Sequence, residues 1–163
     1  MTLHLDPAVF TFREDARFSG PESQEVVLLN GPFDGLRTAV EFPAGCARDV
    51  IEVPRNTRSV YHRLSPATNA FLWRTRSLLA YAKNPGLFSG PAEAVFCHFF
   101  TGPRGGWQGP VGRSHFSDSS LELSLPEHEG GFYAAQAMFY DSKHEQMAIV
   151  CIWIDNSRLG PKL

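Results

Sequence analysis

Apolar residues along the chain gather into short runs that are separated by turn-forming residues, and this pattern predicts a β-rich protein. Val26–Leu29 is a β-branched run, and the segment after it, Asn30–Gly35, is dense in residues that favour turns. Leu121–Leu125 alternates apolar and polar residues, which is typical of a half-exposed strand. We detect no internal repeat along the chain. Further strands are expected over Leu36–Phe42, Asp49–Val53, Ser59–Leu64 and Ala94–Phe100.

The two strongest strand predictions are Phe132–Tyr140 and Met147–Ile154. Because the connection between them, Asp141–Gln146, is short and polar, we expect an antiparallel hairpin. Both faces of both strands are largely apolar, which predicts a place in the middle of a sheet that is covered on both faces. Residues 1–24 and 156–163 are expected to be peripheral, as edges or tails.

The segment 66–84 is compatible with two structures. It could form a helix that begins after Ser65 and ends before Pro85. The pattern of apolar residues favours this helix over Leu78–Lys83. Over Phe71–Arg76 the alternative is a strand that pairs with the predicted strand before it.

These elements together predict one mainly-β domain over residues 1–163. Its architecture is expected to be an antiparallel β-sandwich or a strongly curved sheet, with at most one or two short helices. The composition, 43% hydrophobic and 20% charged, is typical of a globular chain. No apolar run is long enough for a membrane-spanning helix, and the first residues do not resemble a signal peptide. We therefore expect a cytoplasmic protein without a membrane partner.

Three short stretches, Leu29–Gly35, Pro43–Gly45 and Tyr61–Arg63, together resemble a pattern in small uncharacterised phage and bacterial proteins. In those proteins a strand leads into a (Gly/Asn)-Gly-Pro-x-Asp-Gly turn, a second strand ends in Pro-x-Gly, and a Tyr-x-Arg strand follows. The resemblance covers residues 26–64. It implies a β architecture and brings no activity, cofactor or partner with it.

Charge is distributed unevenly along the chain, although the net charge is only −2. Residues 1–52 carry nine acidic and four basic residues, residues 53–113 carry one acidic and eight basic residues, and residues 114–163 carry seven acidic and three basic residues. The segments therefore have net charges of −5, +7 and −4. The near-neutral total excludes a generally basic protein but leaves room for a local positive site.

Seven of the eight basic residues in segment 53–113 are arginines, and aromatic residues lie among them. Arginine grips phosphate or carboxylate with two hydrogen bonds and stacks on rings, so this mixture is suited to an anionic partner such as a nucleic acid, a nucleotide or an acidic protein. The alternative is that the segment forms surface ion pairs with the acidic ones. The residues proposed to bind the partner are Arg55, Arg58, Arg63, Trp73, Arg74, Arg76, Arg104, Trp107 and Arg113.

Part of this surface falls in Thr101–Gly112, which contains five glycines and two prolines and is predicted to be a loop. Its glycines would allow the backbone to approach a ligand closely. The alternative is a plain flexible connection.

The six histidines and three cysteines show none of the spacings of a local metal motif, so we predict no metal site and no cofactor. A metal site assembled from distant strands is the alternative. The cysteines are too few and too widely spaced for a disulfide framework.

Weak candidates for catalysis are His98, His115 and Asp118. The last two lie in Ser114–Ser120, which combines a histidine and an aspartate with four serines. No Gly-x-Ser-x-Gly elbow is present, and dense Ser and Asp also mark turns and caps.

Three functions follow from these observations. The first is a non-enzymatic protein that binds an anionic partner through the arginine and aromatic residues. The second is a structural or assembly subunit, a homo-oligomer of phage or accessory type. The third is a hydrolase or transferase whose site is assembled only in the fold.

Overall fold

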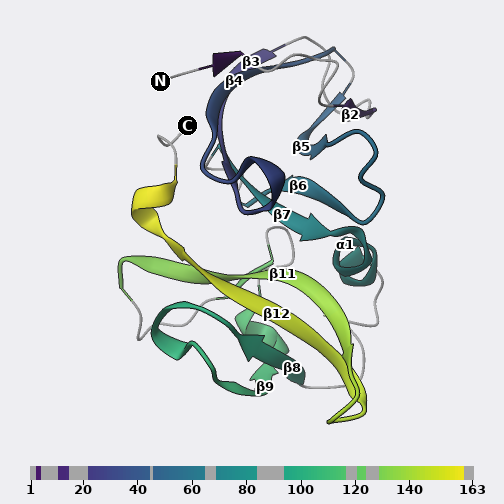
Figure 1. The fold of residues 1–163 in the computed structure, drawn as a ribbon, viewed down its shortest axis with the longest axis vertical. Helices are drawn as coiled ribbons and strands as arrows, with labels where there is room; N and C mark the ends of the chain where they lie inside the picture. Colours follow the sequence, from purple (N-terminus) through teal and green to yellow (C-terminus); the bar gives the residue numbers. More distant parts are fainter. Residues whose placement is uncertain are drawn as a thin grey trace. The chain divides into compact units, whose positions relative to one another are not determined.

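The computed structural model describes residues 3–4, 11–14, 22–44, 46–64, 69–83, 94–116, 121–123 and 129–159. It is mainly β, with two curved sheets and one short α-helix, which confirms the predicted fold class (Figure 1). The chain comprises two compact units, residues 1–73 with 158–163 and residues 74–157. The single domain expected over 1–163 stays a prediction.

The first sheet has the strand order β1-β4-β3-β7-β6-β5-β2. A 3₁₀ turn, η1 (Gly31–Phe33), connects β3 to β4, and buried residues from β3 to β7 form a core. The strands are β1 (Leu3–His4), β2 (Thr11–Glu14), β3 (Glu22–Leu29), β4 (Arg37–Phe42), β5 (Cys46–Glu52), β6 (Ser59–Arg63) and β7 (Ala70–Thr75).

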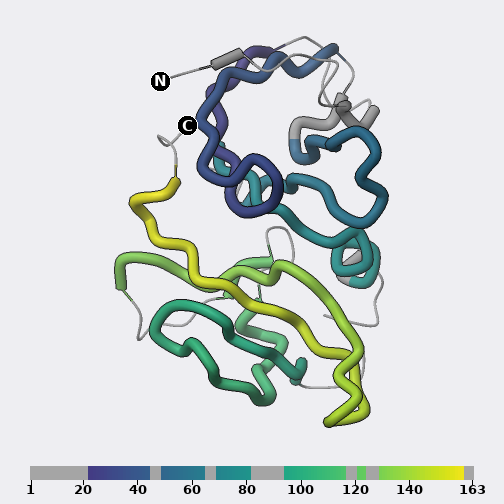
Figure 2. The backbone as a smooth tube through the Cα atoms, in the orientation of Figure 1, coloured from purple at the N-terminus to yellow at the C-terminus, as the bar shows by residue number. Residues whose placement is uncertain are grey.

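The second sheet has the order β10-β11-β12-β8-β9 and a core that includes Leu78 of α1. Figure 2 shows β11 and β12 curving together through this unit. The elements are α1 (Arg76–Lys83), β8 (Ala94–Phe99), η2 (Gly102–Arg104), β9 (Gln108–Gly112), η3 (Arg113–His115), β10 (Glu122–Leu123), β11 (Gly131–Asp141), β12 (Gln146–Asp155) and, after the sheet, η4 (Asn156–Arg158).

The second sheet repeats the central five strands of the first. The order β4-β3-β7-β6-β5 matches β9-β8-β12-β11-β10, and in both copies the first two strands are antiparallel while the second and third are parallel. The register matches as well. Leu28 pairs with Phe71 across the parallel strands of the first sheet, and Phe99 pairs with Cys151 at the same place in the second.

Each copy also contains the same turn, in which one tyrosine hydroxyl is hydrogen-bonded to the residue before a 3₁₀ turn and to the last residue of that turn. We call this arrangement the clasped turn, or clasp. In the first unit, the Tyr61 hydroxyl donates to the Asn30 carbonyl at 2.8 Å and accepts from the Phe33 amide at 2.9 Å. In the second, the Tyr133 hydroxyl donates to the Thr101 carbonyl at 2.5 Å and accepts from the Arg104 amide at 2.7 Å.

A glycine with positive φ begins the 3₁₀ turn in both copies, and a tryptophan packs against it. Gly31 has φ 70° and Gly102 has φ 74°. A Cβ built on Gly31 would lie 2.5 Å from Trp73, and one built on Gly102 would lie 2.4 Å from Trp153. Only glycine therefore fits at the start of either turn.

The expectation of no internal repeat is wrong at the level of structure. The residues that the copies share are few: a Gly-Pro pair, a following glycine, a tyrosine and a tryptophan. Their separation along the chain is 71 residues for the Gly-Pro pair, 72 for the tyrosine and 80 for the tryptophan. No fixed period exists, because the loops between the shared residues differ in length.

Most of the predicted elements are confirmed. The hairpin over 132–154 is antiparallel and occupies the middle of its sheet. The ambiguous segment contains both predicted structures, the strand β7 and the helix α1. In the part of the chain that the structure describes, no helix is long and apolar enough to cross a membrane.

The predicted loop over Thr101–Gly112 is wrong in part, because Gln108–Gly112 forms strand β9. Pro110 lies opposite Phe96 in this strand. A proline has no amide hydrogen for a ladder, but β9 is the last strand of its sheet and needs hydrogen bonds on one side only.

One arginine lies in the interior of the second unit. The pairing of β11 with β12 is interrupted by a bulge between Ala135 and Ala137. Arg74, which is completely buried, donates from Nε to the Ala135 carbonyl at 2.8 Å. Burial lowers the pKa of Arg74 to about 9, a shift that the charge of Glu122 opposes, so the guanidinium remains charged at neutral pH.

Candidate metal centre

The site is built on one face of the second sheet, around His98 of β8. Side chains alternate along a strand, so Phe96 and His98 share a face that Cys97, in the core, does not. The parallel pairing of β8 with β12 places Val150 beside His98. Because β11 is the next strand after β12, the same face continues onto the end of the β11–β12 hairpin.

The hairpin turn is organised by Asp141, the last residue of β11. Its Oδ1 accepts hydrogen bonds from the backbone amides of Lys143 at 3.0 Å and His144 at 3.2 Å. This is the usual role of an aspartate at the start of a turn, where its carboxylate binds amides two and three residues later. The turn thereby fixes both the carboxylate and the backbone of His144.

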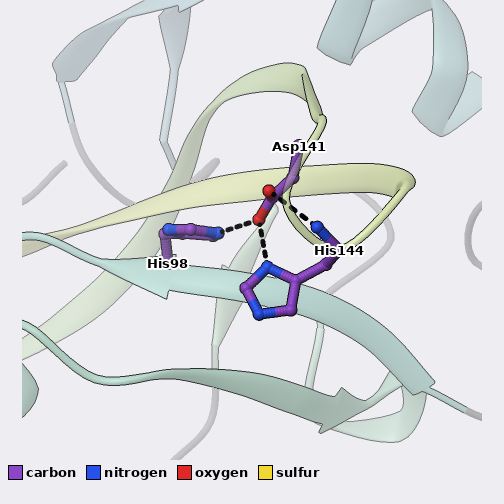
Figure 3. Close-up of side chains that lie close together, drawn as sticks. All are labelled: His98, Asp141 and His144. Atoms are coloured by element: carbon purple, nitrogen blue, oxygen red, sulfur yellow. Dashed lines mark hydrogen bonds and ion pairs between the residues drawn. The ribbon is translucent and has the colours of Figure 1, made fainter.

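The second oxygen of Asp141 binds both imidazoles. Asp141 Oδ2 lies 2.9 Å from His98 Nε2 and 2.8 Å from His144 Nδ1 (Figure 3). The three ligand-type atoms all lie within 4.8 Å of one another. Two imidazoles and one carboxylate therefore converge on one point, although His98 and Asp141 are 43 residues apart in the sequence.

Asp141 is ionised at neutral pH. Desolvation raises its pKa, but the hydrogen bonds from His144 and His98 outweigh this and hold the pKa at about 2. An ionised carboxylate only accepts hydrogen bonds, so both imidazole nitrogens that face it must donate. His98 therefore donates from Nε2 and His144 donates from Nδ1.

The three ligand-type atoms lie within 4.8 Å of one another, and two of their separations are shorter than those between the ligands of a metal ion. Ligands around a tetrahedral Zn²⁺ ion, each about 2.0–2.2 Å from the metal, lie about 3.4 Å apart. The two contacts of Asp141 Oδ2 are shorter than this by about half an ångström. To act as three metal ligands, the carboxylate oxygen would have to move away from both nitrogens, the two nitrogens would have to lie about 3.4 Å apart, and each imidazole would have to carry its proton on the opposite nitrogen.

Aromatic rings surround the cluster and restrict its side chains. The His98 ring has edge contacts with Phe96 at 5.4 Å and Phe139 at 5.1 Å between centroids. Phe96 also lies 4.7 Å from the His144 ring. The side chains of Asp141 and His98 are 8% and 13% exposed, whereas that of His144 is 33% exposed, so access to the cluster is from the side of His144.

Of the catalytic candidates predicted from the sequence, His98 and His115 lie at different places along the second sheet. His98 pairs with Gln108, whereas Gly112, next to the helix of His115, pairs with Ala94. These pairs are four residues apart on β8, which is about 13 Å. Asp118 lies outside the described residues.

Of the arginines predicted to bind a partner, one is buried and a second, Arg63, is half-buried and paired within the first unit. Arg74 is fully buried. The Arg63 guanidinium binds the side chains of Asn69 at 3.0 Å and Gln24 at 2.9 Å and stacks 4.5 Å from the centre of the Phe71 ring. The sequence pattern of arginines and aromatic residues does not distinguish a surface arginine from one that supports the fold.

The other predicted partner-binding residues are distributed over several elements. Trp73 packs in the clasp of the first unit, and the Nε and Nη1 atoms of Arg113 are buried. Trp107 is 41% exposed. Their role in binding an anionic partner stays a prediction, as it does for the exposed or half-buried Arg55, Arg58, Arg76 and Arg104.

The sequence alone predicts no metal site and does not point to Asp141 or His144. The available signal was a histidine three residues after an aspartate in a hairpin turn. The third residue, His98, could be added only by knowing that β8 lies beside β12.

The comparisons with known proteins do not add to this geometry. No family model matches the chain, and neither a curated protein nor a solved structure is significantly similar to it. The resemblance to phage and bacterial proteins stays a prediction.

Proposed function

We propose that this protein binds a divalent transition-metal ion of the zinc class through His98, Asp141 and His144. The observation that carries the proposal is the convergence of two imidazoles on one carboxylate oxygen, at 2.9 and 2.8 Å. Imidazole and carboxylate ligands suit Zn²⁺, Fe²⁺, Co²⁺ and Ni²⁺, whereas Ca²⁺ and Mg²⁺ require more oxygen ligands than one aspartate supplies.

The surroundings of the three residues support the proposal. The backbone amides of Lys143 and His144 donate to Asp141 Oδ1, the oxygen that does not face the imidazoles. These hydrogen bonds orient the carboxylate in the way that outer-shell partners orient the ligands of a metal site. The rings of Phe96 and Phe139 restrict the rotation of His98. The site is therefore largely formed before the metal arrives, which reduces the entropic cost of binding.

Isothermal titration of the metal-free protein with Zn²⁺ tests the proposal. We expect one ion per chain for the natural protein and a loss of affinity of at least 100-fold for His98→Ala, His144→Ala and Asp141→Asn. His115→Ala is the matched control, because His115 is an exposed histidine of the same unit that lies outside the cluster. The proposal is wrong if Zn²⁺ does not bind, or if His115→Ala weakens binding as much as His98→Ala does.

A further inference from the structure

The three protein ligands would leave at least one coordination position of the metal open. Structural zinc sites have four protein ligands, whereas sites with three keep a position for water or substrate. Among the described residues, the cluster contains one carboxylate and two imidazoles and no further ligand-type side chain. The open position would face the side of His144, the most exposed of the three ligands.

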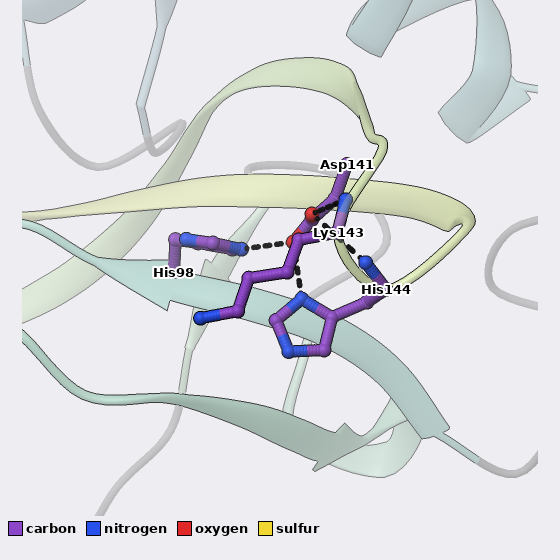
Figure 4. Close-up of polar contacts among 4 residues, drawn as sticks. All are labelled: His98, Asp141, Lys143 and His144. Atoms are coloured by element: carbon purple, nitrogen blue, oxygen red, sulfur yellow. Dashed lines mark hydrogen bonds and ion pairs between the residues drawn. The ribbon is translucent and has the colours of Figure 1, made fainter.

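A positive charge lies on the same side of the cluster. Lys143 is exposed, and its backbone is fixed by the hydrogen bond from its amide to Asp141 Oδ1. Figure 4 shows its side chain extending from the turn toward the side of the carboxylate on which both imidazoles lie. A divalent metal with one carboxylate ligand has a net charge of +1, and Lys143 adds another. The open position is therefore suited to an anion.

An apolar surface adjoins His98, one of the three ligands. Phe100 follows β8 on the same face as His98, with 6.4 Å between the ring centroids, and it is 60% exposed. Phe96 and Phe139 contact the other edges of the His98 ring. The phenyl rings around His98 would thus be within reach of an apolar arm on an anion bound at the metal.

We propose that the metal site takes a small carboxylate ligand with an apolar arm, in which the carboxylate binds the metal near Lys143 and the arm packs against Phe100. The proposal rests on the proposed function, because the metal provides the main attraction for the carboxylate. A carboxylate is favoured over a phosphate, since the site offers one lysine and several rings. Phosphate, which prefers several cationic or amide donors, is the comparator in the test.

The experiment uses the full chain loaded with Co²⁺, whose visible absorption spectrum changes when a ligand enters the coordination shell. Phenylacetate, acetate and inorganic phosphate are titrated separately. We expect phenylacetate to bind about tenfold more tightly than acetate, because part of its phenyl ring is removed from water. Equal affinity for phenylacetate and acetate, tighter binding of phosphate, or an unchanged spectrum would overturn the proposal.

Two variants test separately whether the apolar arm of the ligand contacts Phe100 and whether Lys143 attracts its carboxylate. Phe100→Ala should remove the difference between phenylacetate and acetate without changing the affinity for Co²⁺. Lys143→Gln should weaken both carboxylates alike, by about threefold. Tyr140→Ala is the matched control, since Tyr140 is also 60% exposed but lies on the opposite face of the hairpin, and it should change neither ligand. A failure to bind Co²⁺ at all would refute the proposed function instead.

Discussion

The two units of this protein have the same five-strand scaffold but differ at the end of one hairpin. Twelve positions separate Tyr61 from Trp73, and twenty separate Tyr133 from Trp153, so the hairpin of the second unit is eight residues longer. Asp141 and His144 both lie within this longer hairpin. In the first unit, the position that corresponds to His98 is occupied by Val27.

This difference separates the residues that make the fold from those that make the site. The clasped turn, which needs a glycine, a tyrosine and a tryptophan, occurs in both units and holds β3 to β4 and β8 to β9. The histidine–aspartate cluster occurs only in the second unit among the described residues. We infer that the shared residues stabilise the scaffold and that the longer hairpin adds a binding site to one copy.

The largest expected effect on stability is at Arg74, which only the second unit uses to support its bulge. Arg74→Ala should lower the free energy of unfolding by about 4 kcal/mol, because it leaves a cavity and removes the partner of the Ala135 carbonyl. Urea denaturation followed by circular dichroism measures the change. Arg76→Ala, at an exposed position two residues later, is the control and should change stability by no more than about 0.5 kcal/mol. Equal effects of the two variants would contradict the supporting role of Arg74.

The next effect tests whether the two clasped turns are equivalent. Gly31→Ala and Gly102→Ala should each cost about 3 kcal/mol, since the new Cβ meets a tryptophan and the backbone has positive φ. Hydrogen exchange should show faster exchange of β3 amides in the first variant and of β8 amides in the second. Gly35→Ala has positive φ but open space around it, so we expect a cost of only about 1 kcal/mol. If Gly35→Ala is as damaging as Gly31→Ala, packing against Trp73 is not the cause.

The sequence predicted the scaffold better than the site, and for a physical reason. Strands such as β12 are specified by local runs of apolar residues, so their existence could be inferred without knowing their neighbours. The pairing of His98 with Val150 depends on the parallel register between β8 and β12, which no local pattern encodes. The sequence predicts the strand of His98 and the polar turn that contains Asp141, but no local pattern indicates that the two side chains meet.

The repeat was missed for a related reason. A few residues with special backbone or packing roles, such as Gly31 and Trp73, define each copy, while the apolar residues between them are interchangeable. Leu28 and Phe99 occupy the same position in the two sheets and are equally buried. Hydrophobic cores tolerate such exchanges when volume and pattern are retained, so the fold can be repeated without a visible repeat in the sequence.

Removing one hydroxyl from each clasp should have a smaller effect that is similar in the two units. Tyr61→Phe and Tyr133→Phe each leave a backbone carbonyl and an amide without their partner, which should cost about 2 kcal/mol. Urea denaturation measures both. Tyr140→Phe, at a 60% exposed position, is the control and should be neutral. A large effect at only one of the two clasps would show that the turns are not equivalent.

The smallest expected effect is the dependence of stability on alkaline pH that Tyr61 gives to the first unit. Burial, with the charge of Asp34, raises the pKa of Tyr61 to about 12, although the Phe33 amide opposes the shift. Burial also raises the pKa of Tyr133, against the Arg104 amide and charge. An unfolded tyrosine ionises near pH 10, so the unfolded chain loses its proton first. The stability that Tyr61 contributes is therefore complete below about pH 10 and is lost as the pH rises toward 12.

The test compares the free energy of unfolding at pH 9 and pH 11 in the natural protein and in Tyr61→Phe. Stability should decrease less over this interval in Tyr61→Phe, because its phenyl ring has no proton to lose. Absorbance at 295 nm, which follows tyrosine ionisation, should show one fewer group titrating above pH 11 in the variant. If the decrease in stability is the same in both proteins, the buried hydroxyl of Tyr61 is not the group that couples the first unit to alkaline pH.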